Sequence, residues 1–115
     1  MFRGRYEHTV DTKGRLSIPA KYREILLGKG DDRLIITNFV ANSKRCLDVY
    51  PLDEWLVLEE AVRQKPKFDA RMVRFQTYYL GGATECAADT HGRVLIPPTL
   101  RRYADLTRDV MLVSA

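Results

Sequence analysis

Residues 11–23 read Asp11-Thr-Lys-Gly-Arg15-Leu-Ser-Ile-Pro19-Ala-Lys-Tyr-Arg23, and residues 89–101 read Asp89-Thr-His-Gly-Arg93-Val-Leu-Ile-Pro97-Pro-Thr-Leu-Arg101. The two stretches align without a gap at an offset of 78 residues, and seven of their thirteen positions are identical. Unrelated stretches of this length would share about one position by chance. The chain therefore contains an internal repeat, and each copy carries the pattern D-T-x-G-R-h-x-I-P-x-x-x-R, in which h is an aliphatic residue.

Each copy of the repeat predicts a strand, a tight turn, a second strand and a short helix. In the first copy, residues 5–10 alternate polar and apolar side chains, which is typical of a strand with one buried face. Residues 11–14 predict the turn, because aspartate favours its opening position and Gly14 tolerates a positive φ. Leu16 begins the return strand. Pro19 suits the first turn of a helix, which we expect to end at Gly28.

The first copy continues into a predicted β-hairpin, and the second copy stops before its counterpart. Residues 34–39 and 46–50 have the composition of strands, and the polar residues 41–45 connect them. At the repeat offset, the apolar residues 110–115 match only the first of these strands. We therefore expect a second half-unit that is truncated at the C-terminus.

Two helices are predicted between the copies. Residues 52–64 place Trp55 and Val62 on one helix face, and residues 69–80 begin with Asp69, which is a good N-cap. The chain therefore divides into three parts, namely a first half-unit of residues 1–50, connecting helices of residues 51–80, and a second half-unit of residues 81–115.

Neither half-unit is large enough to bury its apolar face alone. In the first half this face carries Tyr6, Val10, Leu16 and Ile18, and a strand-turn-strand unit with one short helix cannot cover them. We therefore expect the halves to pack against each other as a pseudo-dimer. The predicted fold class is β-rich α+β, with the helices between the repeats.

The charge of the chain is compatible with a polyanionic partner. Nineteen Lys and Arg residues against 15 Asp and Glu give a formal net charge of +4. Residues 1–23 alone hold six basic and two acidic side chains, so this end is the cationic one. The longest apolar runs are far shorter than the roughly 20 residues of a membrane span, and no signal peptide precedes them. We expect a cytoplasmic protein whose two cysteines are thiols.

The sequence favours neither an enzyme nor a metalloprotein. It contains no nucleophile elbow and no phosphate-binding loop, so we expect no catalytic residue, no cofactor and no small-molecule substrate. His8, Cys46, Cys86 and His91 carry the side chains that bind zinc, but His8 and Cys86 occupy equivalent repeat positions and no C-x-x-C pair is present. We therefore expect no metal site.

The two D-x-x-G-R-h-x-I-P cores, with helices between them, resemble the MraZ family of bacterial transcriptional regulators over essentially the whole chain. The resemblance implies two AbrB-like halves that form a swapped-hairpin β-barrel, and a homo-oligomer that closes into a ring. It also implies binding to double-stranded promoter DNA that carries short direct repeats. The promoter would be that of the division and cell-wall gene cluster, to which the family's own gene belongs. Repression is the usual outcome, and the protein would be associated with the nucleoid.

Arg15 and Arg93 are the first candidate DNA-binding residues, and each has two interpretations. Each follows the turn glycine and could form an internal salt bridge to the turn aspartate, Asp11 or Asp89. Alternatively, its planar guanidinium could bind phosphate or the O6/N7 edge of guanine. Both interactions are compatible, because five N–H donors exceed what one carboxylate accepts.

Further basic residues support these two arginines. In AbrB-like proteins, basic residues at positions matching the helix after the Ile-Pro pair face DNA, which makes Arg23, Arg101 and Arg102 candidates. Arg3, Arg5 and Lys13 are candidates for electrostatic support of phosphate contacts. A solvated helix face is the alternative for the helical ones. The residues expected to shape the turns themselves are Asp11, Gly14, Asp89 and Gly92.

Two classes of function remain open. The first is a sequence-specific DNA-binding repressor. The second is a protein-interaction ring that sequesters a partner enzyme through its exposed strand ends and charged poles. Both would use self-association, which the acidic residues 53–60 and the basic residues 63–74 favour as a head-to-tail contact.

Overall fold

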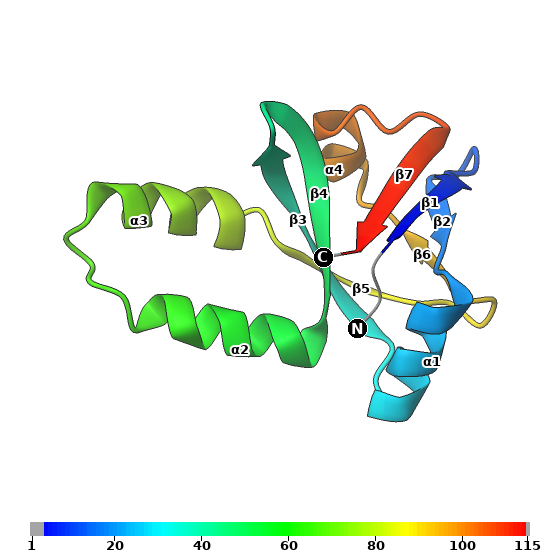
Figure 1. Cartoon of the computed structure of the whole chain (residues 1–115), viewed down its shortest axis with the longest axis horizontal. Helices are drawn as coiled ribbons and strands as arrows, with labels where there is room; N and C mark the ends of the chain where they lie inside the picture. The colour runs from blue at the N-terminus through cyan, green and yellow to red at the C-terminus, as the bar shows by residue number, and fades with distance from the viewer. Residues whose placement is uncertain (1–3, 115) are drawn as a thin grey trace.

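In the computed structural model of the chain, the two repeats exchange strands (Figure 1). The structure describes residues 4–114. In chain order its elements are β1 Gly4–Thr9, β2 Arg15–Ser17, α1 Ala20–Lys29, β3 Arg33–Ala41, β4 Lys44–Pro51, α2 Leu52–Arg63, α3 Ala70–Phe75, the π-helical turn η1 Gln76–Leu80, β5 Thr84–Ala87, β6 Arg93–Leu95, α4 Pro98–Tyr103 and β7 Asp109–Ser114.

The first strand of each copy pairs with the last strand of the other copy. Strand β1 of the first copy runs antiparallel to β7 of the second, and β5 of the second runs antiparallel to β3 of the first. The registers differ by two residues at the 78-residue offset, because Tyr6 faces Leu112, whereas the equivalent Thr84 faces Ile36 and not Leu34. The predicted pseudo-dimer is therefore confirmed, and each half completes a sheet of the other.

The short strands β2 and β6 pair about a local twofold axis. Leu16 faces Val94, which is its own repeat equivalent. The main chain repeats this symmetry, because Ile18 donates to the carbonyl of Gly92 at 2.8 Å and Ile96 donates to the carbonyl of Gly14 at 3.0 Å. These bonds bring the two turns into one body.

The strands of residues 4–114 form three separate sheets, β1–β7, β2–β6 and β4–β3–β5, so the predicted closed barrel is wrong for this part of the chain. Strands β2 and β6 have only three residues each and run into Pro19 and Pro97. A proline has no N–H to extend a ladder, so the central pair of strands stays short. The mixed, strand-rich α+β class is confirmed.

Strand β3 is buried on both faces and separates two apolar clusters. Leu34 and Ile36 face the first cluster, to which both halves contribute and which consists of Ile18, Leu26, Leu34, Ile36, Val94 and Leu100. Ile35 faces the second cluster, where it packs with Trp55 and Tyr79. The first cluster therefore joins the two halves of the molecule.

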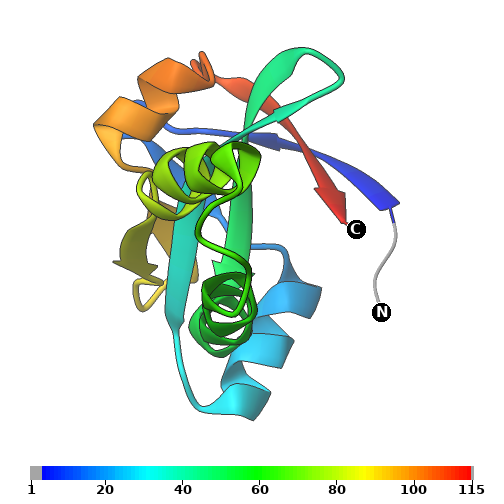
Figure 2. The same cartoon turned by 90° about the vertical axis from the view of Figure 1, so that its left-hand side faces the viewer.

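Helices α2 and α3 with η1 project away from the sheets as a helical hairpin, which faces the viewer in Figure 2. Its returning end is fixed by two buried side chains of β3. The hydroxyl of Thr37 donates to the carbonyl of Tyr79 at 2.5 Å, and the amide of Asn38 donates to the carbonyl of Tyr78 at 3.1 Å. These donors satisfy carbonyl groups that a π-helical turn leaves without a regular partner. None of the helices in residues 4–114 is long and apolar enough to cross a membrane.

Three element boundaries differ from the prediction. Helix α1 continues past Gly28 and ends at Gly30, whose φ of 66° forms a left-handed cap. The predicted loop of residues 41–45 is a two-residue turn at Asn42 and Ser43, both with positive φ. The predicted helix of residues 69–80 is α-helical only to Phe75 and then widens into η1.

Candidate nucleic-acid interface

The first turn is held together by the carboxylate of Asp11. One carboxylate oxygen accepts the backbone N–H of Lys13 at 2.9 Å and that of Arg15 at 2.8 Å, and the other accepts the Nε of Arg15 at 2.7 Å. Gly14 has a φ of 87°, which side-chain-bearing residues rarely adopt, and its N–H donates to the carbonyl of Asp11 at 3.0 Å. The turn is therefore a small unit held by bonds among four residues, which are Asp11, Lys13, Gly14 and Arg15.

The second turn repeats this arrangement bond for bond. Asp89 accepts the backbone N–H of His91 at 2.8 Å and that of Arg93 at 2.9 Å, and its second oxygen accepts the Nε of Arg93 at 3.1 Å. Gly92 has a φ of 73° and donates to the carbonyl of Asp89 at 3.0 Å. Asp89 and Gly92 therefore make the same bonds in the second turn as Asp11 and Gly14 make in the first.

Both turn aspartates are stabilised in their ionised form. The backbone N–H of Arg15, followed by the Arg15 side chain, lowers the pKa of Asp11 to about 2. The backbone N–H groups of Arg93 and His91 and the Arg93 guanidinium likewise lower the pKa of Asp89. The salt bridges of Asp11 with Arg15 and of Asp89 with Arg93 are therefore present at neutral pH.

These salt bridges use only one edge of each arginine. Arg15 and Arg93 engage their aspartates through Nε, and within residues 4–114 their terminal Nη groups make no hydrogen bond. Each side chain is about 29% exposed, so the guanidinium still reaches the surface. The salt bridge orients the arginine and leaves its Nη donors available for an anion.

Each turn is covered by an arginine from the other half of the molecule. A Cβ added at Gly14 would overlap the guanidinium of Arg101, which belongs to α4. A Cβ added at Gly92 would overlap the side chain of Arg23, which belongs to α1. The molecule therefore contains two composite sites, Arg15 with Arg101 and Arg93 with Arg23, and each requires both repeats.

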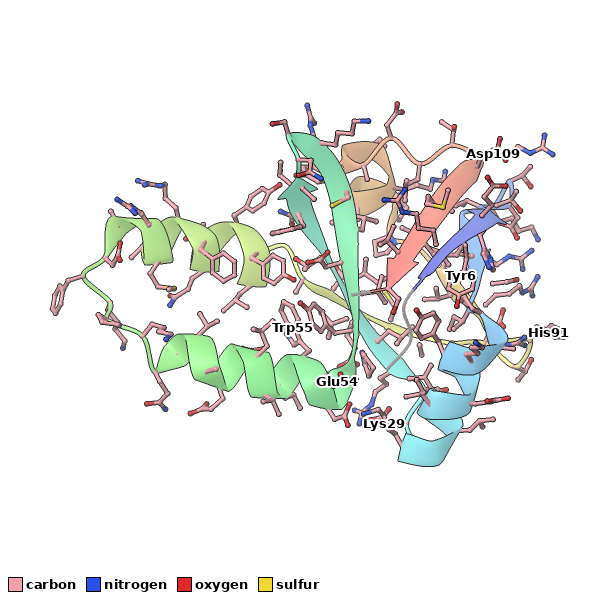
Figure 3. All side chains as sticks on the ribbon, viewed as in Figure 1. Tyr6, Lys29, Glu54, Trp55, His91 and Asp109 are labelled. Carbon is pink, nitrogen blue, oxygen red and sulfur yellow. The ribbon has the colours of Figure 1, made fainter. Side chains whose placement is uncertain are left out.

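Both turns lie at the edge of the molecule opposite the helical hairpin (Figure 1), and His91 projects from that edge (Figure 3). Lys13, Arg23 and Arg102 are exposed, Arg101 is half-buried, and the exposed Arg5 lies on β1. In the part of the chain that the structure describes, none of these five forms an ion pair with an acidic side chain. Arg3 lies outside the described residues.

One property of the site was not predicted from the sequence. The repeat predicted which arginines matter, but not that each helix arginine crosses to the turn of the other copy. The signal was the repeat itself, because self-pairing of Leu16 with Val94 places each helix beside the opposite turn.

The residues considered for a metal site are distributed over different strands. His8 faces Val110, Cys86 faces Leu34 and Cys46 faces Phe39. No three metal-ligating side chains of residues 4–114 gather in one place. Burial raises the pKa of both thiols and favours their uncharged form.

Comparison with known proteins identifies relatives along nearly the full length of the chain. A protein-family model described as "MraZ protein, putative antitoxin-like" matches residues 1–77 and 79–115. The protein named Transcriptional regulator MraZ from Desulfitobacterium hafniense is 47% identical over 114 residues, which are 99% of this chain and 75% of that protein. Proteins of the same name from Natranaerobius thermophilus and Thioalkalivibrio sulfidiphilus are 45% and 43% identical, over 99% of this chain and 75% and 74% of their own lengths. The chain therefore belongs to the MraZ family.

Proposed function

We propose that this chain is a DNA-binding transcriptional regulator whose two composite arginine sites bind promoter DNA. The observation that carries the proposal is the duplicated turn, in which Asp11 or Asp89 orients one arginine while the opposite half supplies a second. Two guanidinium groups with available N–H donors suit the phosphate backbone and the guanine edge of the major groove. The relatives are named as transcriptional regulators, which agrees with this chemistry.

The two sites have complementary tasks in this proposal. Arg15 and Arg93 are held at their turns by the salt bridges, and a preorganised fork is suited to reading base edges. Arg23, Arg101 and Arg102 lie on helices and contribute phosphate contacts, as do Arg5 and Lys13. Arg3 joins this group on the basis of sequence alone.

The target that fits a duplicated site is a set of short repeated boxes. The resemblance stated above implies direct repeats in the promoter of the division and cell-wall gene cluster, and we propose repression of that promoter as the outcome. One chain reads few base pairs, so useful affinity requires several chains on successive boxes. In this proposal the protein is associated with the nucleoid.

We also propose that the chain assembles into a ring through the helical hairpin. Apolar contacts contribute to this assembly in addition to the charged segments expected from the sequence. Much of the acidic segment is already neutralised internally, because Lys29 binds Asp53 at 2.8 Å and Glu54 at 3.5 Å (Figure 3). The hairpin also exposes apolar side chains, among them Val57 at 72% and Phe68 at 100%. Apolar contact therefore supports self-association at least as well as the charged poles do.

A double-mutant cycle tests the composite sites. The single variants Arg15→Ala, Arg101→Ala and Arg23→Ala should each weaken operator binding, by about 1–3 kcal/mol for each base-reading contact. Because Arg15 and Arg101 share one site, their double variant should be non-additive. Arg15 and Arg23 belong to different sites, so their effects should add. The measurement is fluorescence anisotropy with labelled promoter DNA.

Arg33→Ala is the matched control for these variants. Arg33 lies on β3 and pairs with Asp31, outside the composite sites and the helical hairpin, so its removal should leave DNA binding unchanged. Affinity should also fall by powers of ten between low and moderate salt, because phosphate contacts release counterions. A protein-interaction module would respond weakly to salt. Salt-independent binding with unaltered Arg15→Ala affinity would refute the proposal.

Assembly has a separate test. Val57→Asp and Phe68→Asp should shift sedimentation of the protein at micromolar concentration toward a smaller species, because each places a charge in the apolar contact. A wild-type chain that sediments as a monomer with and without promoter DNA would contradict the ring.

A further inference from the structure

The two turns differ at one position of the D-T-x-G-R pattern, which is Lys13 in the first turn and His91 in the second. In each turn the backbone N–H of this residue donates to the aspartate carboxylate, at 2.9 Å and 2.8 Å respectively. The main chain therefore holds the two side chains at equivalent places, and both are exposed. Figure 3 shows His91 at the outer edge of the molecule.

The charged groups around the two positions correspond within the turns, but helix α1 carries Lys21 and Glu24 where helix α4 carries Thr99 and Arg102. His91 has Asp89 and Arg93 in its own turn, and helix α1 brings Arg23 over Gly92. The same helix carries Lys21 and Glu24 as exposed residues.

Lys13 has Asp11 and Arg15 in its turn, with Arg101 from α4 over Gly14. The carboxylate in both turns is already engaged by the arginine and by two backbone N–H groups. The side chain at the variable position is therefore oriented to solvent or ligand rather than to that carboxylate.

We infer that His91 is a further DNA-binding residue, which contacts phosphate ionically only when its imidazole is protonated. This inference rests on the proposed function and adds that the two turns bind DNA with different dependence on pH. Lysine is cationic throughout the physiological range, whereas histidine gains or loses its charge between about pH 5 and pH 8. The two turns therefore differ in the kind of side chain that they offer to phosphate at this position, a lysine in the first and a histidine in the second.

The expected signature is a pH-dependent salt response. Each ionic contact to B-DNA phosphate contributes about 0.9 to the slope of log affinity against log salt. Between about pH 8 and pH 6 the slope for the wild-type protein should steepen by about one for each chain that engages DNA through its second turn. Affinity should rise in parallel, because only the protonated imidazole forms the contact.

Four variants of the full chain test the inference on promoter DNA. His91→Lys should show the steep slope at both pH values, and His91→Gln the shallow slope at both. Lys13→His should double the change of slope with pH, because both turns then carry a histidine at this position. His8→Gln removes the only other histidine of the chain and should behave like the wild type. Thermal unfolding at both pH values establishes that each variant is folded.

The outcomes separate this inference from the proposed function. If the wild-type protein binds promoter DNA through Arg15 but His91→Gln retains the wild-type pH dependence, the inference is wrong and the proposed function stands. If His91→Lys binds like the wild type at both pH values, the inference is also wrong. If the wild-type protein shows no salt-dependent binding at either pH, the proposed function itself fails.

Discussion

The two D-T-x-G-R turns have the same internal geometry in different surroundings. The Nε–carboxylate distances are 2.7 Å for Arg15 and 3.1 Å for Arg93, and the two turn glycines have similar positive φ values. Yet β3 has strands on both sides, whereas β7 pairs with β1 alone among the described strands. Helix α1 has ten residues and α4 has six. The geometry of each turn is therefore encoded by the residues of the turn itself, while the arginine that covers it comes from the other half of the molecule.

The largest expected effect on stability is at Leu100, which anchors the shorter helix α4 in the core. Leu100 is the buried residue of α4, and Leu100→Ala should lower the free energy of unfolding by about 2–5 kcal/mol, because it removes apolar contacts and leaves a cavity. Leu27→Ala is the matched control, since Leu27 is 79% exposed and its loss should change stability by less than about 0.5 kcal/mol. Urea denaturation provides both values. Equal stabilities would mean that α4 is not anchored in the shared core.

Glycine substitutions test whether both turns need their backbone conformation and their covering arginine. Gly14→Ala and Gly92→Ala should each destabilise the fold by about 1–2 kcal/mol, because both positions have positive φ. Each should also weaken DNA binding by displacing Arg101 or Arg23.

Gly28→Ala is the control for the glycine series, since a Cβ there meets open space within α1. It should stabilise the protein by about 0.5–1 kcal/mol. Thermal unfolding and anisotropy together measure the series. If the turn variants bind DNA normally, the covering arginines are not part of the interface.

Acid titration compares the two aspartates. A carboxylate whose pKa is lowered on folding stabilises the protein above its ordinary pKa of 3.8, and for Asp11 this contribution is lost as pH falls through about 2. Asp11→Asn should therefore be less stable than the wild type at neutral pH and lose less stability between pH 3.8 and pH 2. Asp89→Asn should change stability in the same direction. Unfolding curves collected across this range test both, and wild-type acid sensitivity in either variant would contradict the prediction.

The smallest effect is expected at Arg102. This residue is exposed and forms no ion pair within residues 4–114, so Arg102→Gln should leave stability within about 0.5 kcal/mol of the wild type. Its equivalent position in the first half is Glu24, so a phosphate contact at Arg102 would belong to the second half alone. The salt slope of DNA binding should fall by about one for each contacting chain, with similar losses on different DNA sequences. A loss confined to the operator would indicate base reading instead.

The turns were predictable from the sequence because their determinants are local. Aspartate four residues before arginine, with glycine between, fixes the bonds seen in both copies. The widening of the helix at Gln76 was not predictable, since Thr37 and Asn38, some 40 residues away, hold its last carbonyl groups. The end of α1 was misplaced because Gly28 is tolerated within the helix, whereas Gly30 supplies the left-handed cap.

The exchange of strands also constrains how the chain acquires its structure during synthesis. Strand β1 emerges first from the ribosome, but its partner β7 is encoded about a hundred residues later, at Asp109–Ser114. The first half therefore cannot complete its sheets on its own, however well its turn is encoded. The residues up to β7 must be available before this long loop closes, which makes folding slow relative to a chain of local contacts. A nascent chain arrested after the helical hairpin would expose β1 as an unpaired edge, which is a binding site for chaperones or for another nascent copy.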